Sequence, residues 1–232
     1  MHELIKCENL SMSYGGTMAL RDINLSIPNG RIIGLLGPNG SGKTTFMKLA
    51  AGLLVPTQGS IRIGGHPIGP ESKSMVSFLP EKTYLNSALS VSDALELFND
   101  FYADFDDNAA ASMLAKLDIP LNARMKTLSK GTKEKVQLIL VMARKAQLYL
   151  LDEPIAGVDP AARDYILDTM LSNFHADATL IISTHLIYDI ERILDEFIFL
   201  QNGSIVAYDT VDNARQTNSK SIDELFREVF RC

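Results

Sequence analysis

Cysteine and tryptophan are scarce in this sequence of 232 residues, which has two cysteines, Cys7 and Cys232, and no tryptophan. The cysteines lie near opposite ends of the chain without CxxC spacing. We therefore expect neither a disulfide framework nor a cysteine metal site, and the chain suits a reducing compartment. Long apolar runs are also missing: the amino terminus has no signal-peptide core, and no segment reaches the ~18 continuous apolar residues of a membrane span. If the protein acts in a membrane process, we expect another chain to supply the membrane-spanning segments.

Positive charge is in deficit as well. Lysine and arginine number 22 against 28 aspartates and glutamates, which gives a net charge of -6. No overall basic field attracts a nucleic-acid backbone, so we expect no nucleic-acid partner. The length favours one large α/β domain, or one domain with an inserted subdomain, over tandem domains.

The hydrophobic patterns that remain predict an α/β frame with a helical insert. Strand patterns occupy residues 3–14, 22–30, 31–37 and 60–65. A helical period follows from about residue 91 to 146, and strands and helices then alternate. The segment RIIGLLG is apolar throughout, which is typical of a strand buried on both faces of a parallel sheet. The tail, SIDELFREVF, predicts a short amphipathic helix at residues 221–230 that packs on the domain or docks a partner.

The segment GPNGSGKT at residues 37–44 follows this apolar strand and precedes a helical run. It matches the G-x-x-x-x-G-K-[ST] phosphate loop in the context that the loop requires. Glycines let backbone N–H groups turn inward around an anion, and the helix N-terminus adds positive charge. We expect Lys43 to neutralise the β- and γ-phosphates and Thr44 to ligate Mg²⁺. The predicted nucleotide-binding residues are Gly37, Pro38, Asn39, Gly40, Ser41, Gly42, Lys43, Thr44 and Thr45.

The segment LYLLDEP at residues 148–154 is an apolar strand that ends in two carboxylates. Alternation along a strand predicts that these side chains point in different directions. Asp152 is then expected to hold Mg²⁺, while Glu153 faces the γ-phosphate and polarises the attacking water. A solvated turn is the alternative for such a pair, and the phosphate loop upstream favours the catalytic interpretation.

With these motifs in this order, the chain resembles the nucleotide-binding subunits of ATP-binding cassette (ABC) transporters from about residue 5 to residue 208. The resemblance implies a P-loop NTPase with a RecA-like α/β core, an antiparallel β-subdomain and an inserted α-helical subdomain at about residues 82–146, all within one domain spanning residues 1–232. It also implies that Tyr14 stacks on adenine and that Asp159, in GVDP, reaches across a dimer interface. The resemblance further implies that His185, at the end of ISTH, contacts the γ-phosphate and helps orient Glu153.

The segment LSKGT at residues 128–132 occupies the position of the family signature LSGGQ. In the family, this helix N-terminus of one subunit presses on the γ-phosphate held by the other. Ser129 and Gly131 match the signature, whereas Lys130 and Thr132 depart from it. The backbone N–H groups and the helix dipole still supply an anion site. The alternative is a surface helix with a solvated basic face.

A second departure from the family is Glu81, in PEKTYLN, where a glutamine usually ligates Mg²⁺. A carboxylate can also ligate the metal, but it adds negative charge near a γ-phosphate. Our hypothesis is that Lys130 of the opposing subunit compensates that charge, through a pair with Glu81 that closes only when ATP is bound.

The resemblance implies ATP hydrolysis coupled to transport at the cytoplasmic face of a cell membrane. The expected partners are a transmembrane permease on a separate chain, received in a groove near residues 81–86, and a second nucleotide-binding subunit in a homodimer or heterodimer. The motifs are similar to those of bacterial ABC exporter ATPases of the YtrB kind. Two alternatives are a soluble cassette ATPase that acts as a clamp in translation or DNA maintenance, and a regulatory cassette that hydrolyses ATP poorly.

Overall fold

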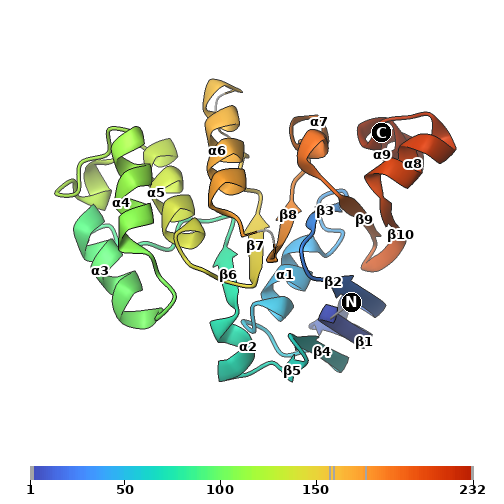
Figure 1. Ribbon diagram of the computed structural model, residues 1–232. Coiled ribbons are helices and arrows are strands. Elements are labelled where there is room, and N and C mark those ends of the chain that lie inside the picture. The colour runs from blue at the N-terminus through green and yellow to red at the C-terminus, as the bar shows by residue number, and fades with distance from the viewer. Residues whose placement is uncertain (1–2, 157, 159, 176, 231–232) are drawn as a thin grey trace.

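The computed structural model describes residues 3–156, 158, 160–175 and 177–230. Within them, a central sheet divides the molecule into layers (Figure 1). Its strands, in spatial order, are β10 (Ser204–Thr210), β9 (Glu196–Gln201), β3 (Ile32–Leu36), β8 (Thr179–Ser183), β7 (Leu148–Asp152) and β6 (Val76–Leu79). The strands from β9 to β6 are parallel, and β10 is antiparallel to β9.

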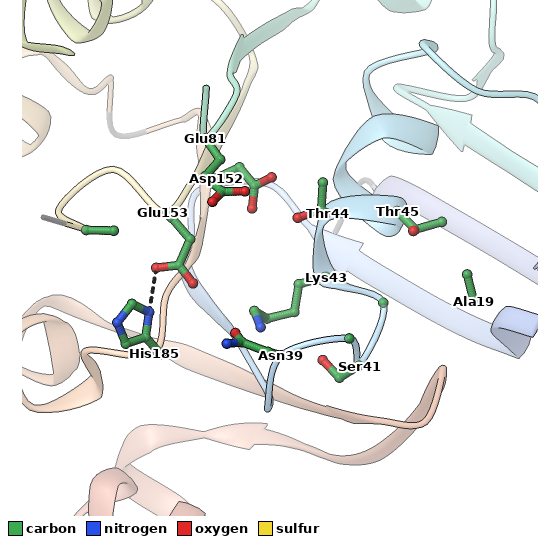
Figure 2. Close-up of a pocket in the computed structure, with 13 residues that line it drawn as sticks. Ala19, Asn39, Ser41, Lys43, Thr44, Thr45, Glu81, Asp152, Glu153 and His185 are labelled. Atoms are coloured by element: carbon green, nitrogen blue, oxygen red, sulfur yellow. Dashed lines mark hydrogen bonds and ion pairs between the residues drawn. The ribbon is translucent and has the colours of Figure 1, made fainter. Parts of the chain in front are cut away.

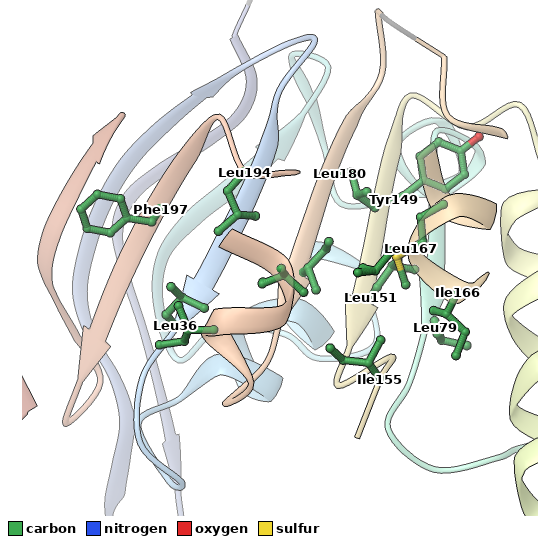
Figure 3. Packing of buried hydrophobic residues seen from close by; sticks show 14 of the residues in the cluster. Leu36, Leu79, Tyr149, Leu151, Ile155, Ile166, Leu167, Leu180, Leu194 and Phe197 are labelled. Atoms are coloured by element: carbon green, nitrogen blue, oxygen red, sulfur yellow. The ribbon is translucent and has the colours of Figure 1, made fainter. Parts of the chain in front are cut away.

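The central strands are buried and mostly apolar because helices or strands cover both of their faces. All five residues of β7 are buried. Leu148 and Leu150 pack in one hydrophobic cluster with Phe46, whereas Tyr149 and Leu151 pack in another on the opposite face. Figure 3 shows part of this second cluster. The sequence prediction of a parallel sheet buried on both faces therefore agrees with the structure.

A second, antiparallel sheet lies beside the first and holds the amino terminus. Its strands are ordered β2 (Thr17–Pro28), β1 (Glu3–Tyr14), β4 (Gln58–Ile63) and β5 (His66–Pro67). Helix α1 (Lys43–Ala50) shares a core with this sheet and with the central one, through Phe46, Met47 and Leu49. A short helix, α2 (Pro70–Ser74), leads into β6. These four strands, all from the first third of the chain, thus form the antiparallel β-subdomain beside the helix that follows the phosphate loop, while β3 from the same third belongs to the central sheet.

Three helices form a lobe with its own hydrophobic cluster, at the left of Figure 1. They are α3 (Val91–Phe101), α4 (Asp107–Lys116) and α5 (Lys130–Met142), and the 3₁₀ turn Met125–Thr127 precedes α5. Each begins at a capping side chain: Ser90 accepts from the Asp93 N–H, Asp106 from Ala109 and Ser129 from Thr132. Local sequence therefore determines where these helices start.

Arg144, which is 3% exposed, lies just beyond α5 and joins the helical lobe to the central sheet. Its guanidinium donates to the backbone oxygens of Val76 and Ser74, at 2.5 and 2.8 Å, and to both carboxylate oxygens of Asp104, at 3.0 Å. The same group lies 3.9 Å from the centre of the Tyr102 ring. Four hydrogen bonds thus engage all three nitrogens of this buried guanidinium, and they bond the lobe to β6.

The remaining helices cover the face of the central sheet shown in Figure 3. They are α6 (Pro160–Asn173), α7 (Ile187–Ile190), α8 (Val211–Asn218) and α9 (Ile222–Phe230). The pattern LIYDIERIL predicts one helix, but the structure has the short α7 followed by a 3₁₀ turn, Glu191–Ile193. In α9, the rings of Phe226 and Phe230 each meet the Phe199 ring of β9 edge to face, with ring centroids 5.6 Å apart, so the tail helix packs on the domain. Among the described residues, every helix is too short or insufficiently apolar to cross a membrane.

Candidate functional site

A cavity of about 460 Å³ opens at the carboxyl ends of the central strands, where parallel α/β sheets generally place their ligands. Separate segments of the chain contribute to it: the loop before α1, the turn after β6, the ends of β7 and β8, and β2 (Figure 2). Its lining residues are Ala19, Asn39, Gly40, Ser41, Gly42, Lys43, Thr44, Thr45, Glu81, Asp152, Glu153, Ala156 and His185. The fold thus brings the sequence-predicted phosphate loop and carboxylates into one space.

The loop before α1 depends on glycine at two positions. Gly42 caps α1 with φ 111°, in the left-handed region, and a Cβ there would lie 2.6 Å from the Ala19 carbonyl oxygen. At Gly37 a Cβ would lie 2.2 Å from the carbonyl oxygen of Leu200. The loop is also held by the Gly203 N–H, which donates to the backbone carbonyl oxygen of Ser41 at 3.0 Å. The result is a helix N-terminus fixed at the cavity, which suits an anion.

Lys43 places a positive charge at the cavity wall. Its Nζ donates to the Gly37 carbonyl oxygen at 2.8 Å. Burial lowers the pKa of this ammonium, and the carboxylates of Glu153, Asp152 and Glu81 oppose that shift. Since those acids share the cavity, the lysine faces a strongly acidic wall that suits a ligand of mixed charge, such as phosphate with a cation.

Asp152 offers an oxygen for that cation. Its side chain is buried, and one oxygen accepts from the Ser183 hydroxyl at 2.5 Å. The other oxygen, Oδ2, has no hydrogen-bond partner among the described residues. Thr44 and Glu81 line the same cavity. An oxygen donor set of this kind fits Mg²⁺. Within the part of the chain that the structure describes, no group of three or more acidic, histidine or cysteine side chains is arranged to hold a metal.

Glu153 follows β7 and does not belong to it. Its φ of 53° lies in the left-handed region, an uncommon conformation for a residue with a side chain. The Ser183 carbonyl oxygen accepts from its N–H at 3.0 Å. This backbone turn, more than strand alternation, directs Glu153 away from Asp152. Its Oε2 lies 3.0 Å from Nδ1 of His185, the contact drawn as a dashed line in Figure 2.

Other residues predicted from the sequence lie elsewhere. Within the described residues, Tyr14, Ser129 and Gly131 do not line the cavity. Tyr14 is 47% exposed at the end of β1, and Ser129 and Gly131 are exposed at the start of α5. Asp159 lies outside the described residues. The face formed by Ser129 and Gly131 is therefore free to meet another molecule.

Lys130 lies beside a second, smaller cavity of about 200 Å³, which shares Glu81, Asp152 and Glu153 with the first. Its Nζ is 3.8 Å from Glu134 of the same helix, and its side chain is 86% exposed. An exposed pair of this spacing contributes only ~0.3–0.5 kcal/mol. Lys130 therefore has a partner within its own chain, but a weak one.

An apolar groove of about 540 Å³ runs between α1, β6 and α3. Leu53 and Phe101, which line it, are 60% and 75% exposed. Sequence reasoning expects a groove near residues 81–86, but only Tyr84 of that loop lines this one, and α3 supplies more of its apolar surface.

Sequence reasoning also missed three residues at this site. Ala19, from β2, and Ala156 form part of the cavity wall, and Ser183 orients Asp152 from outside the lining. Ser183 lies in the ISTH segment quoted for His185, so the motif contained a signal for it. No local pattern marks Ala19.

Comparison with known proteins agrees with this geometry. The ABC transporter family matches residues 20–156, which span the phosphate loop and the Asp152–Glu153 pair. The chain belongs to the ABC transporter family. It is thus an ATP-binding subunit of the ABC ATPase type, and the predicted P-loop fold class is confirmed.

Individual ABC relatives align over nearly the whole chain. The ATP-binding protein YtrB of Bacillus subtilis is 30% identical over 98% of this chain and 75% of its own length. The Nod factor export ATP-binding protein I of Cupriavidus pinatubonensis is 28% identical over 90% of this chain and 68% of its own length. A solved ATP-binding subunit of an ABC transporter superposes with a TM-score of 0.88 at 30% identity, covering 98% of this chain and 99% of that one. The predicted resemblance to YtrB-like subunits is confirmed as a similarity.

Proposed function

We propose that this chain is the ATPase subunit of a bacterial ABC exporter, and that it drives a separate membrane permease through ATP-dependent dimerisation. The observation that carries the proposal is the division of the site. The phosphate loop, Asp152, Glu153 and His185 share one cavity, while Ser129 and Gly131 lie on an exposed face outside it. A second subunit placed head to tail would bring its own α5 N-terminus to the γ-phosphate. Export is supported by a relative that is named for export.

In the proposed reaction, the phosphate loop and Lys43 hold the triphosphate of ATP. Glu153 polarises the water that attacks the γ-phosphorus, and His185 keeps Glu153 in place through their 3.0 Å contact. Thr44, Asp152 and Glu81 would hold Mg²⁺, which when bound screens charge on the phosphate oxygens. The partner's Ser129 and Gly131 amides would stabilise the charge that develops on the γ-phosphate.

Tyr14 and Asp159 keep the roles that the family resemblance implies, adenine stacking and contact across the dimer. We assign residues 1–232 to a single cassette domain with a helical subdomain at about 82–146. The permease would dock in the apolar groove beside α3, at the cytoplasmic face of the membrane. Copurification from membranes in mild detergent tests that partner.

Dimerisation is tested with the variant Glu153→Gln, which should bind ATP without hydrolysing it. Light scattering after size-exclusion chromatography should find monomers without nucleotide and dimers with Mg-ATP. The matched control adds Gly131→Asp, since a Cβ at Gly131 meets no atom within 4 Å and the fold should accept it. The added carboxylate should repel the partner's phosphate and keep the protein monomeric. A dimer that forms equally with and without Gly131→Asp would contradict the role of the α5 face.

Glu81 and Lys130 both line the smaller cavity of a single chain. A test of their proposed pairing must therefore distinguish a contact within one chain from a contact across the dimer. We expect Glu81→Gln and Lys130→Gly to be non-additive in the ATPase rate, with a coupling of about 0.5–2 kcal/mol. The same cycle should be additive in the thermal stability of the nucleotide-free monomer. Coupling in the monomer would assign the pair to one chain, and additivity in both measurements would eliminate it.

A further inference from the structure

Arg163, on α6, contacts two separate segments of the chain. Its Nε donates to the Val158 carbonyl oxygen at 3.1 Å, and its Nη1 donates to Oδ2 of Asp189 at 2.7 Å. The side chains of Arg163 and Asp189 are 25% and 27% exposed. One guanidinium therefore uses two of its donors on acceptors that are far apart in the sequence.

These two segments also carry the residues expected to handle the attacking water. Val158 lies shortly after Glu153 in the chain, and Asp189 belongs to α7, which begins directly after the His185 segment. The Arg163 contacts thus join the same two segments that meet in the 3.0 Å contact between Glu153 and His185. Two sets of non-covalent contacts therefore join these segments: the Glu153–His185 contact inside the cavity and the Arg163 contacts beside it.

An ordinary surface ion pair is the simpler explanation, and the same region provides an example for comparison. Arg192 pairs with Asp164 at 2.7 Å, with side chains that are 62% and 72% exposed. Such exposed pairs contribute ~0–1 kcal/mol. The Arg163 pair differs because it is more buried and because the second donor is engaged with a backbone carbonyl, which fixes the direction of the guanidinium plane.

We propose that Arg163 is a positioning residue for ATP hydrolysis: it holds α7, and with it His185, in register with the Val158 segment, so that His185 stays against Glu153. The proposal rests on the proposed function, in which Glu153 polarises the attacking water and His185 keeps Glu153 in place.

The proposal is tested with Arg163→Gln, Asp189→Asn, the charge-conserving Arg163→Lys and, as the matched control, Arg192→Gln. We expect the first two to lower kcat about 10- to 100-fold while the Kd for ATP, measured with a fluorescent analogue, changes less than about twofold. The control should keep both values. Asp189→Asn also covers the case in which Arg163→Gln does not fold. Arg163→Lys, which keeps the charge without the two-way fork, should recover only part of the rate.

The decisive measurement is a double-mutant cycle of Arg163→Gln and His185→Ala, in which the ATPase rate is measured by the release of radiolabelled phosphate. If Arg163 acts through His185, then Arg163→Gln should lower the rate less than about twofold further once His185 is absent. Additive losses would overturn the proposal, and so would Arg163→Gln and Asp189→Asn behaving like Arg192→Gln. Failure of the proposed function is a separate result: it would appear as a Glu153→Gln variant that still turns over.

Discussion

Replacing Glu153 with glutamine should lower kcat for ATP hydrolysis at least about 100-fold while leaving ATP affinity nearly unchanged. The amide keeps the size of the side chain but cannot take a proton from water. Its contact with His185 can persist, since a glutamine oxygen still accepts. The phosphate loop and Lys43 are untouched, so binding should survive. Steady-state phosphate release, together with titration of a fluorescent ATP analogue, separates the two effects.

The control for this variant is Glu71→Gln, the same chemical change on the exposed part of α2. It should leave both kcat and affinity at their original values. A Glu153→Gln variant that retains more than about a tenth of the original rate would show that another group polarises the water, since removal of a general base typically costs 10²–10⁴-fold. An equal loss of kcat in both variants would mean that the net charge of the protein, and not the position of the Glu153 carboxylate, determines the rate.

Replacing Arg144 with methionine should lower the free energy of unfolding by about 3–5 kcal/mol. The guanidinium is buried, and its removal leaves the Asp104 carboxylate and the Val76 and Ser74 carbonyl oxygens without their donor. Urea unfolding of the nucleotide-free chain, followed by circular dichroism, measures the loss. A change below about 1 kcal/mol would mean that water replaces the lost bonds.

Two further variants isolate the cause of that loss. Lys145→Met removes the neighbouring cation, whose pair with Asp106 has side chains 59% and 29% exposed, and should cost less than about 1 kcal/mol. Adding Asp104→Asn to Arg144→Met should restore part of the stability, because the unpaired carboxylate is then gone. If the double variant is no more stable than the single one, the backbone contacts and not the ion pair hold the lobe.

The parts of this molecule that could be predicted from sequence are those set by short-range pattern. The apolar run of β3, the glycines at 37, 40 and 42, and the strand ending in Asp152 carry their structural reasons within a few residues. Capped helices belong to the same class: Ser90 followed by Asp93 signals the start of α3.

What escaped prediction depends on residues distant in the sequence. Arg144 bonds to Val76, 68 positions away, and its neighbours in the sequence give no sign of that partner. The direction of Glu153 is set by a left-handed backbone held to Ser183, and not by strand alternation. Helix α8 was missed because only two of its residues, Val211 and Ala214, are buried, so its hydrophobic pattern is weak.

The position of Arg144 has a mechanical consequence. It lies just past one end of α5, bonded to the rigid central sheet, while Ser129 lies at the other end of this helix of 13 residues. A helix of that length is about 20 Å long. If the lobe pivots at Arg144, α5 is a lever arm: a turn of about 10° at the fulcrum carries Ser129 through about 3.5 Å, the reach of one hydrogen bond. Val76 and Tyr102 line the apolar groove beside α3 and also contact Arg144, so the groove lies near this pivot. A small displacement at the groove would then move Ser129 by a larger distance.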